Sequence, residues 1–266
     1  MPIEYGFPIH ILSQDDFHAI DRLVMRHAFD IQNELGRFYD EAIYHNELAF
    51  RLKSHGLTVV SEGMIKVRYQ DFVKHYYLDA LVGEGALYEL KAVDALTGVH
   101  EKQLLTYLFL LGLRHGKLIN FSSASVEHRF VSTRLTAADR HSFNLDDRLF
   151  DCKESEDCLI YETLPALLSD WGTRLDVSLY EEALVHFLGG APERVQPLDV
   201  SIGNRIIGTQ KACLLQKDTA LHVSSIVKNS TEYRKYLERL FSHTCLTRIQ
   251  WVNFNRDRVE LITLKK

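Results

Sequence analysis

The sequence predicts a mixed α/β protein made of two copies of one unit. In the N-terminal half, apolar residues at helical spacing and strand-like apolar runs follow one another as two helices, three strands, one helix and two strands. In the C-terminal half, Trp251-Val252-Asn253-Phe254 resembles Leu118-Ile119-Asn120-Phe121 at an offset of 133 residues. Several other apolar positions match at this offset, which favours an internal duplication over chance similarity. Upstream, Gly36 and Tyr44 match Gly172 and Tyr180 at an offset of 136, so the second copy is three residues shorter between its first helix and its first strand.

Two helices are expected at the start of the first unit. Residues 16–34 carry apolar side chains at helical spacing, and Ser13 is a suitable N-cap. Gly36 ends this helix. Residues 39–55 form the second expected helix, which Gly56 ends.

Three strands, a helix and two further strands are expected next. Gly83-Glu84-Gly85 between two apolar runs predicts a tight β-hairpin. The expected strands are 59–69, 72–82, 86–93, 117–121 and 126–131, with a helix near 99–115. This order indicates a mixed sheet with helices packed on it.

The hairpin carries an unusual group of charges. If its turn is centred on Glu84, Asp79 lies opposite Glu89, with Cβ atoms about 4.5–5.5 Å apart, and Lys91 shares their face. Two carboxylates this close repel each other unless a cation lies between them, and burying charges on an apolar hairpin is costly. The group predicts a site for a hard divalent cation beside a lysine. A charged edge that faces solvent is the alternative.

Composition is that of an ordinary globular protein. The 266 residues suffice for one large or two small domains, and the net charge of −5 excludes a broadly basic nucleic-acid coat. The four cysteines follow no zinc-site or disulfide-rich spacing, so free thiols in a reducing cytoplasm are expected. The N-terminus does not resemble a signal peptide, and no apolar run approaches the roughly 20 residues that cross a bilayer. A cytoplasmic protein without a membrane partner is expected.

The repeat divides the chain into a first copy at 1–135, an acidic irregular linker at 136–164, and a second copy at 165–266. The net charge is −3 over residues 1–135, −6 over 136–171 and +4 over 172–266. The basic second copy is a weak indication of a polyanionic partner. Its candidate contacts, unless they form a plain solvated face, are Lys211, Lys217, Lys228, Arg234, Lys235 and Arg239.

The first copy resembles a known group of nucleases. The residues that carry the resemblance are Glu34-Leu35-Gly36, Glu41-Ala42-Ile43-Tyr44, Tyr88-Glu89-Leu90-Lys91-Ala92-Val93, His100-Glu101-x-Gln103-Leu104-Leu105-x-Tyr107-Leu108 and Leu118-Ile119-Asn120-Phe121. Their order and spacing are similar to the GxxExxY family of the PD-(D/E)XK nuclease superfamily. Gln103-x-x-x-Tyr107 is also similar to the motif of RecB-like exonucleases. The chain departs from the family name at Phe38, where a glycine is expected, while Gly36 matches a glycine common two residues earlier.

The resemblance implies two tandem restriction-endonuclease-like αβββαβ units, with a Mg²⁺- or Mn²⁺-dependent site in the first. The metal ligands would be Asp79, Glu89, Glu41 and the backbone carbonyl of Leu90. Lys91 would orient the attacking water, help to deprotonate it, or stabilise the transition state, and these three roles stay open.

The resemblance also implies further residues of the site. Gln103 and Tyr107, spaced i and i+4 on one helix face, would join the catalytic group. His100 and Tyr44 are candidates for substrate binding. A polar helix start is the alternative for His100, and core packing is the alternative for Tyr44.

Five of the proposed catalytic positions are lost in the second copy. At offset 133, Asp79 is replaced by Ala212, Glu89 by His222, Lys91 by Ser224 and Gln103 by Tyr236. At offset 136, Glu41 is replaced by Val177. The second copy is therefore expected to be non-catalytic. It could hold DNA, act as a pseudo-dimer partner of the first copy, or recruit another protein or a second chain.

No iron–sulfur cluster is expected. Some RecB-like nucleases bind one through a cysteine before the nuclease core and three after it, whereas no cysteine precedes Cys152 here.

The expected function is metal-dependent hydrolysis of DNA phosphodiester bonds by the first copy. The alternative is a scaffold derived from a nuclease, which binds nucleic acid or protein without useful turnover. The first copy keeps Asp79, Glu89 and Lys91, whereas the second copy has lost all three. Since positions without a role drift in this fold, their retention in the first copy favours the enzyme. Exonuclease and endonuclease action, single- and double-stranded substrates, and DNA and RNA stay open at this point.

Overall fold

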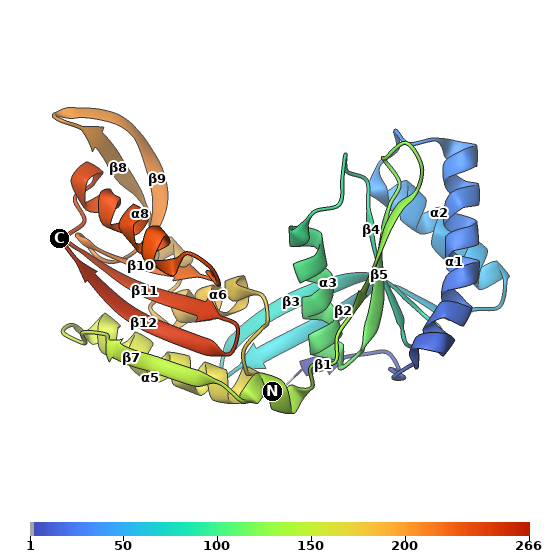
Figure 1. The fold of residues 1–266 in the computed structure, drawn as a ribbon, viewed down its shortest axis with the longest axis horizontal. Helices are drawn as coiled ribbons and strands as arrows, with labels where there is room; N and C mark the ends of the chain where they lie inside the picture. The colour runs from blue at the N-terminus through green and yellow to red at the C-terminus, as the bar shows by residue number, and fades with distance from the viewer. Residues whose placement is uncertain (1–2) are drawn as a thin grey trace. The chain divides into compact units, whose positions relative to one another are not determined.

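The computed structural model describes residues 3–266, and the chain divides into two compact units, Met1–Ala137 and Ala138–Lys266. In both units helices pack on a mixed sheet, which is the fold class that the sequence predicts (Figure 1). None of the helices within residues 3–266 has the length and apolar character that a membrane crossing requires.

The first unit is one mixed sheet with helices on both faces. Its elements are β1 (Ile3–Tyr5), α1 (Gln14–Leu35), α2 (Glu41–Ser54), β2 (Val59–Tyr69), β3 (Phe72–Val82), β4 (Ala86–Lys91), α3 (Gly98–Leu111), β5 (His115–Asn120) and β6 (Glu127–Ser132). The strands pair in the order β1-β2-β3-β4-β5-β6. Strands β4 and β5 are parallel and the other pairs are antiparallel, so α3 is the crossover that a parallel pair needs.

Local chemistry sets the helix boundaries. Ser13 Oγ accepts a hydrogen bond from Asp16 N at 3.1 Å and so caps α1, as expected from the sequence. Helix α3 ends at Leu111, four residues earlier than expected, because Gly112 takes a left-handed conformation with φ of 67°. His115 consequently begins β5 instead of ending α3.

The alternation of strand residues places the charged group on one face of the sheet. Tyr88 and Leu90 belong to the apolar core that packs against α1 and α2. Since successive strand residues point to opposite faces, Glu89 and Lys91 lie on the other face of the sheet. Helix α3 packs on that face, opposite α1 and α2 (Figure 1).

The second unit is built in a similar way. Its elements are α4 (Ala137–His141), β7 (Asn144–Leu149), α5 (Ser155–Trp171), α6 (Val177–Phe187), α7 (Ala191–Arg194), β8 (Val195–Ile202), β9 (Arg205–Gln216), β10 (Thr219–Ser224), α8 (Ser230–His243), β11 (Arg248–Asn255) and β12 (Arg258–Lys265). The strands pair in the order β7-β12-β11-β10-β9-β8. Strands β10 and β11 are parallel across α8, as β4 and β5 are across α3.

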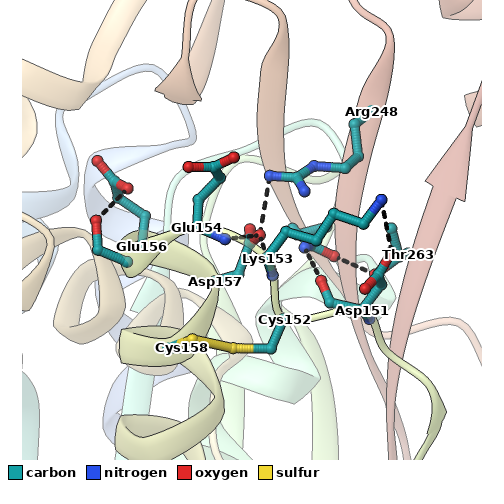
Figure 2. Close-up of a disulfide and its surroundings, with 11 residues drawn as sticks. Asp151, Cys152, Lys153, Glu154, Glu156, Asp157, Cys158, Arg248 and Thr263 are labelled. Carbon is teal, nitrogen blue, oxygen red and sulfur yellow. Dashed lines mark hydrogen bonds and ion pairs between the residues drawn. A yellow bond between two sulfur atoms is a disulfide. The ribbon is translucent and has the colours of Figure 1, made fainter.

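The segment 136–164 is not the irregular linker expected from its acidic composition. It contains α4, β7 and the first half of α5, and β7 joins the second sheet beside β12. Its acidic residues pair with basic residues of the same unit: buried Asp157 contacts Arg248 of β11 at 2.9 Å (Figure 2). The negative charge of this segment thus offsets the positive charge of the strands that follow.

The expectation of four free thiols is wrong for two of the cysteines. Cys152 and Cys158 form a disulfide at the start of α5 (Figure 2). The turn into the helix brings their Cα atoms to 5.3 Å, a distance that sequence spacing alone does not reveal. Cys213 is buried and Cys245 is exposed, and both are free.

The two units share side-chain contacts at the offsets found in the sequence. In each unit, an asparagine near the end of the second parallel strand makes two kinds of hydrogen bond. It bonds the backbone that follows the first parallel strand, and it bonds the side chain of a glutamate in the next antiparallel strand. The residues are Asn120, Val93 and Glu127 in the first unit and Asn253, Ile226 and Glu260 in the second.

A buried tyrosine is a second shared contact. Its hydroxyl donates to a glycine carbonyl at the end of the first long helix, and its ring packs on a phenylalanine at the C-terminal end of the second parallel strand. The residues are Tyr44, Gly36 and Phe121 in the first unit and Tyr180, Gly172 and Phe254 in the second.

Replacing Tyr44 by phenylalanine tests the weight of this contact. The hydroxyl donates to Gly36 O at 2.9 Å and accepts from Tyr39 N at 3.1 Å, so Tyr44→Phe removes both bonds and keeps the ring. We expect the free energy of unfolding to fall by about 1–3 kcal/mol in urea titrations. Tyr39→Phe, at an exposed position, is the control and should have little effect. Equal stability of the two variants would contradict the expectation.

Candidate active site

The candidate site lies where β3 and β4 separate. Their ladder pairs Val82 with Ala86, Leu81 with Leu87 and Ala80 with Tyr88, and then stops. The predicted opposition of Asp79 and Glu89 is the next step of this register, one pair beyond the end of the ladder.

At this point a side-chain hydrogen bond to the Asp79 carboxylate takes the place of the backbone pairing. Its Oδ2 accepts a hydrogen bond from Leu90 N at 2.7 Å. Beyond Ala80 and Tyr88 the two strands are thus joined by this side-chain hydrogen bond, which holds the Asp79 carboxylate beside β4.

Three carboxylates surround the ammonium of Lys91. Its Nζ lies 2.8 Å from Glu89 Oε1, 3.7 Å from Asp79 Oδ2 and 4.0 Å from Glu41 Oε1. The Glu89 side chain is 1% exposed and that of Lys91 is 12% exposed. One positive charge therefore faces three acidic groups in a poorly solvated site, as expected for Asp79, Glu89, Lys91 and Glu41 taken together.

Burial and mutual repulsion raise the pKa of the acidic groups. Desolvation, followed by the nearby charge of Asp79, raises the pKa of Glu89 to about 8. Burial likewise raises the pKa of Asp79 and of Glu41 above their ordinary values, against the opposing effect of Lys91. Burial alone would lower the pKa of Lys91, but the carboxylates together raise it.

Glu41 reaches the group from another element. It is the first residue of α2, directly after the N-cap Asp40. An acidic side chain is favourable in the first turn of a helix, because the free N–H groups there carry partial positive charge. The helix start thus brings a third acid to a site otherwise built on the hairpin.

Helix α3 supplies two further polar groups. Gln103 Nε2 donates to the Tyr107 hydroxyl at 3.2 Å, one helical turn apart. Burial raises the pKa of Tyr107, and the charges of Glu89, Asp79 and Lys91 also act on it. The predicted pair therefore lies within electrostatic reach of the carboxylates.

Two predicted substrate-binding residues have other contacts. His100 Nδ1 accepts a hydrogen bond from Thr97 N at 3.1 Å and so caps the start of α3. Tyr44 is fully buried, and its hydroxyl holds the turn between α1 and α2. Both correspond to the structural alternatives, and for Tyr44 direct contact with a substrate is wrong because no part of the side chain is exposed.

Sequence reasoning missed His45. This residue of α2 is buried, and its Nε2 lies 2.7 Å from the backbone oxygen of Asp79. A signal was present, since His45 follows Glu41 by four residues and therefore lies on the same helical face.

The residues fit a divalent cation of the magnesium type. Glu89 Oε2 is buried without a hydrogen-bond partner, and three acids share a single ammonium. Within residues 3–266 no three acidic, histidine or cysteine side chains form a ready coordination group. Mg²⁺ does not require one, because it keeps several waters and binds proteins through one or two carboxylates.

The raised carboxyl pKa values predict how stability depends on pH in metal-free protein. Between pH 4.5 and about 8, folded Glu89 keeps a proton that the unfolded chain has lost. The stabilisation is therefore fully present below pH 4.5 and is lost as the pH rises through 8. Urea titrations with a chelator should show wild type losing stability relative to Glu89→Gln over this range. A pH-independent difference between the two proteins would contradict this origin.

A family model and a solved structure are each similar to part of this chain. Residues 18–131 match the family model of the PD-(D/E)XK nuclease superfamily, and the match includes the whole charged group. A solved structure described as the crystal structure of SSO0001 is 17% identical, with a TM-score of 0.29 and coverage of 47% of this chain. The chain spans 61% of the length of that relative. No curated protein matches the sequence. Over residues 18–131 the first unit is therefore similar to the PD-(D/E)XK nuclease superfamily.

Proposed function

We propose that the first unit hydrolyses DNA phosphodiester bonds with the help of Mg²⁺ or Mn²⁺. The observation that carries the proposal is the convergence of Glu41, Asp79 and Glu89 on Lys91, with one buried oxygen of Glu89 left without a partner. The raised pKa values of these carboxyl groups show that ionising them together is unfavourable without a further cation, and a bound metal ion would offset that cost. The positions of Glu41 and Tyr44 further support a place in the GxxExxY family.

Asp79 and Glu89 would hold the cation, with Glu41 and the backbone carbonyl of Leu90 as additional oxygen ligands. When bound, the ion supplies positive charge to the phosphate oxygens and makes water a better nucleophile. Hydrolysis then forms a bond from the water oxygen to phosphorus and breaks the bond to the leaving sugar oxygen, which receives a proton.

Lys91 and the α3 pair would act on the reacting groups. The Lys91 ammonium is a hydrogen-bond donor fixed among acids, so it can orient the attacking water or stabilise charge on a phosphate oxygen. Gln103 and Tyr107 present an amide and a phenol on the same side of the sheet, where they can donate to phosphate or water.

Cleavage assays with matched substitutions test this assignment. Glu89→Gln and Lys91→Ala should lower the rate of DNA hydrolysis by about two orders of magnitude or more, since each removes a charge aimed at the reaction. The measurement uses linear, circular, single- and double-stranded DNA with each metal. The controls Glu101→Gln and Lys102→Ala make the same changes in the first turns of α3 and should cleave normally. Site variants that cleave like wild type would refute the assignment.

A measurement of metal binding distinguishes the scaffold alternative from the enzyme. Calorimetry should detect one Mg²⁺ or Mn²⁺ site in wild type that Glu89→Gln weakens or abolishes. A protein that binds neither ion and cleaves no substrate is the result that the scaffold requires.

The second unit is proposed to be a degenerate copy of the first. Apart from the short helix α7, its order of strands and helices from α5 to β12 follows that of α1 to β6. The registers also correspond, with Glu89 beside Leu118 and His222 beside Trp251. The shared asparagine and tyrosine contacts described above support a common origin.

The chemistry of the site is absent from the second unit at the corresponding positions. A cavity of about 150 Å³ lies there, and Ala212 and His222 are among its mostly apolar lining residues. His222 Nε2 is hydrogen-bonded to the Tyr233 hydroxyl at 2.7 Å, and Ser224 bonds Asn253. These groups offer no pair of acids, so the unit would bind DNA, support the first unit, or recruit a protein partner or second chain.

A substitution in the second unit tests its lack of catalysis. His222→Gln should leave the rate of DNA cleavage within about twofold of wild type, because no reacting group is expected near it. The matched change Glu89→Gln should abolish cleavage in the same assay. A loss of cleavage in His222→Gln with an unchanged melting temperature would contradict the proposal.

A further inference from the structure

We propose that His45 is a positioning residue of the candidate site, which fixes the direction of the Asp79 carboxylate by holding its backbone. The inference rests on the proposed function for its catalytic meaning. Its structural part, the control of Asp79 by His45, is testable without any reaction.

The contact has a defined donor and acceptor. His45 Nε2 lies 2.7 Å from Asp79 O, and a carbonyl oxygen only accepts, so Nε2 carries the proton. His45 is 8% exposed and projects from α2 one turn after Glu41. Helix α2 thus carries both Glu41, an acid of the site, and His45, which holds the backbone of Asp79 in β3.

The backbone of Asp79 lies outside both neighbouring ladders. The β2–β3 register pairs Ser61 with Ala80 and Gly63 with Leu78, and it omits Asp79 together with Glu62. Glu62 has a φ of 52°, which is not extended backbone. The β3–β4 ladder also ends before Asp79. Asp79 thus has no register partner of its own, although its neighbours Leu78 and Ala80 are paired, and the hydrogen bond from His45 is a contact made by its backbone oxygen.

The direction of Asp79 matters because of its side-chain contact. Asp79 Oδ2 accepts from Leu90 N at 2.7 Å, and this bond aims the carboxylate toward Lys91 and Glu89. A backbone that turned freely at Asp79 would lose the bond and redirect the carboxylate.

The two units of this chain separate contacts of the fold from contacts of the site. Tyr44 and its hydrogen bond recur as Tyr180 at offset 136, which marks a contact that the fold requires. The next residue, His45, becomes Glu181, and Asp79 becomes Ala212 at offset 133. His45 is thus replaced where the acid that it holds is replaced, whereas its structural neighbour is kept.

Hydrogen exchange of the Leu90 amide measures the clamp directly. In His45→Asn the shorter amide cannot reach Asp79 O, so the Leu90 N–H should exchange about tenfold faster. In His45→Gln the amide nitrogen takes the place of Nε2, and exchange should stay near the wild-type rate. The Ile119 amide of the neighbouring strand is the internal reference, and His55→Asn at the end of α2 is the matched control.

Cleavage provides the second readout. We expect His45→Asn to lower kcat about tenfold or more with little change in KM for DNA, and His45→Gln to recover most of the rate. Equal behaviour of the two variants in exchange and in rate would overturn the proposal and leave His45 as packing. A wild-type protein that cleaves no DNA but shows the expected exchange pattern would refute the proposed function and uphold the clamp.

Discussion

The ammonium of Lys91 among the carboxylates of Glu89, Asp79 and Glu41 is the interaction on which the first unit depends. Isolated charges are expensive to remove from water, and a buried pair recovers that cost only with close geometry. Lys91 meets Glu89 at 2.8 Å, yet three acidic groups share this one ammonium, and their pKa values are raised. The surrounding elements serve this arrangement: the strands separate, α2 begins with an acid, and α3 places polar groups on the same face.

Each unit also contains a buried ion pair of a different kind. Asp21 of α1 contacts Lys117 of β5, and Asp157 of α5 contacts Arg248 of β11. The two acids correspond at the offset of 136, while the cation comes from a different position of the strand. Removing one partner of a buried pair typically costs about 3–5 kcal/mol. These pairs join a helix to the sheet in both units and are therefore part of the fold, in contrast to the charges around Lys91.

Comparison of the units distinguishes what folding requires from what chemistry requires. Asn120 and Tyr44 have counterparts with the same partners in Asn253 and Tyr180, since each satisfies backbone groups that would otherwise be buried without a bond. The acids and the lysine have no counterparts, because nothing in the packing of the second unit calls for them. In that unit the equivalent strands carry Ala212 and His222 beside a small cavity.

The amino-acid sequence by itself determined the elements and the pairing of the hairpin. Helical spacing placed α1 and α2, the Gly83-Glu84-Gly85 turn set the register, and the period of two put Glu89 and Lys91 on one face. These properties follow from short-range geometry. The acidic stretch at 136–164 was misjudged because its partners, such as Arg248, lie far along the chain and polarity alone resembles a solvated linker.

Only the tertiary structure decided which distant groups meet. Tyr44 carries a hydroxyl suited to a substrate, but packing buries it and gives its bonds to the backbone. His45 has no motif, yet α2 lies across β3 so that its ring reaches Asp79 O. The end of the β3–β4 ladder before Asp79 is likewise invisible in the residue pattern. These features depend on how a helix and a sheet approach each other, and that approach is set by the packing of the whole core.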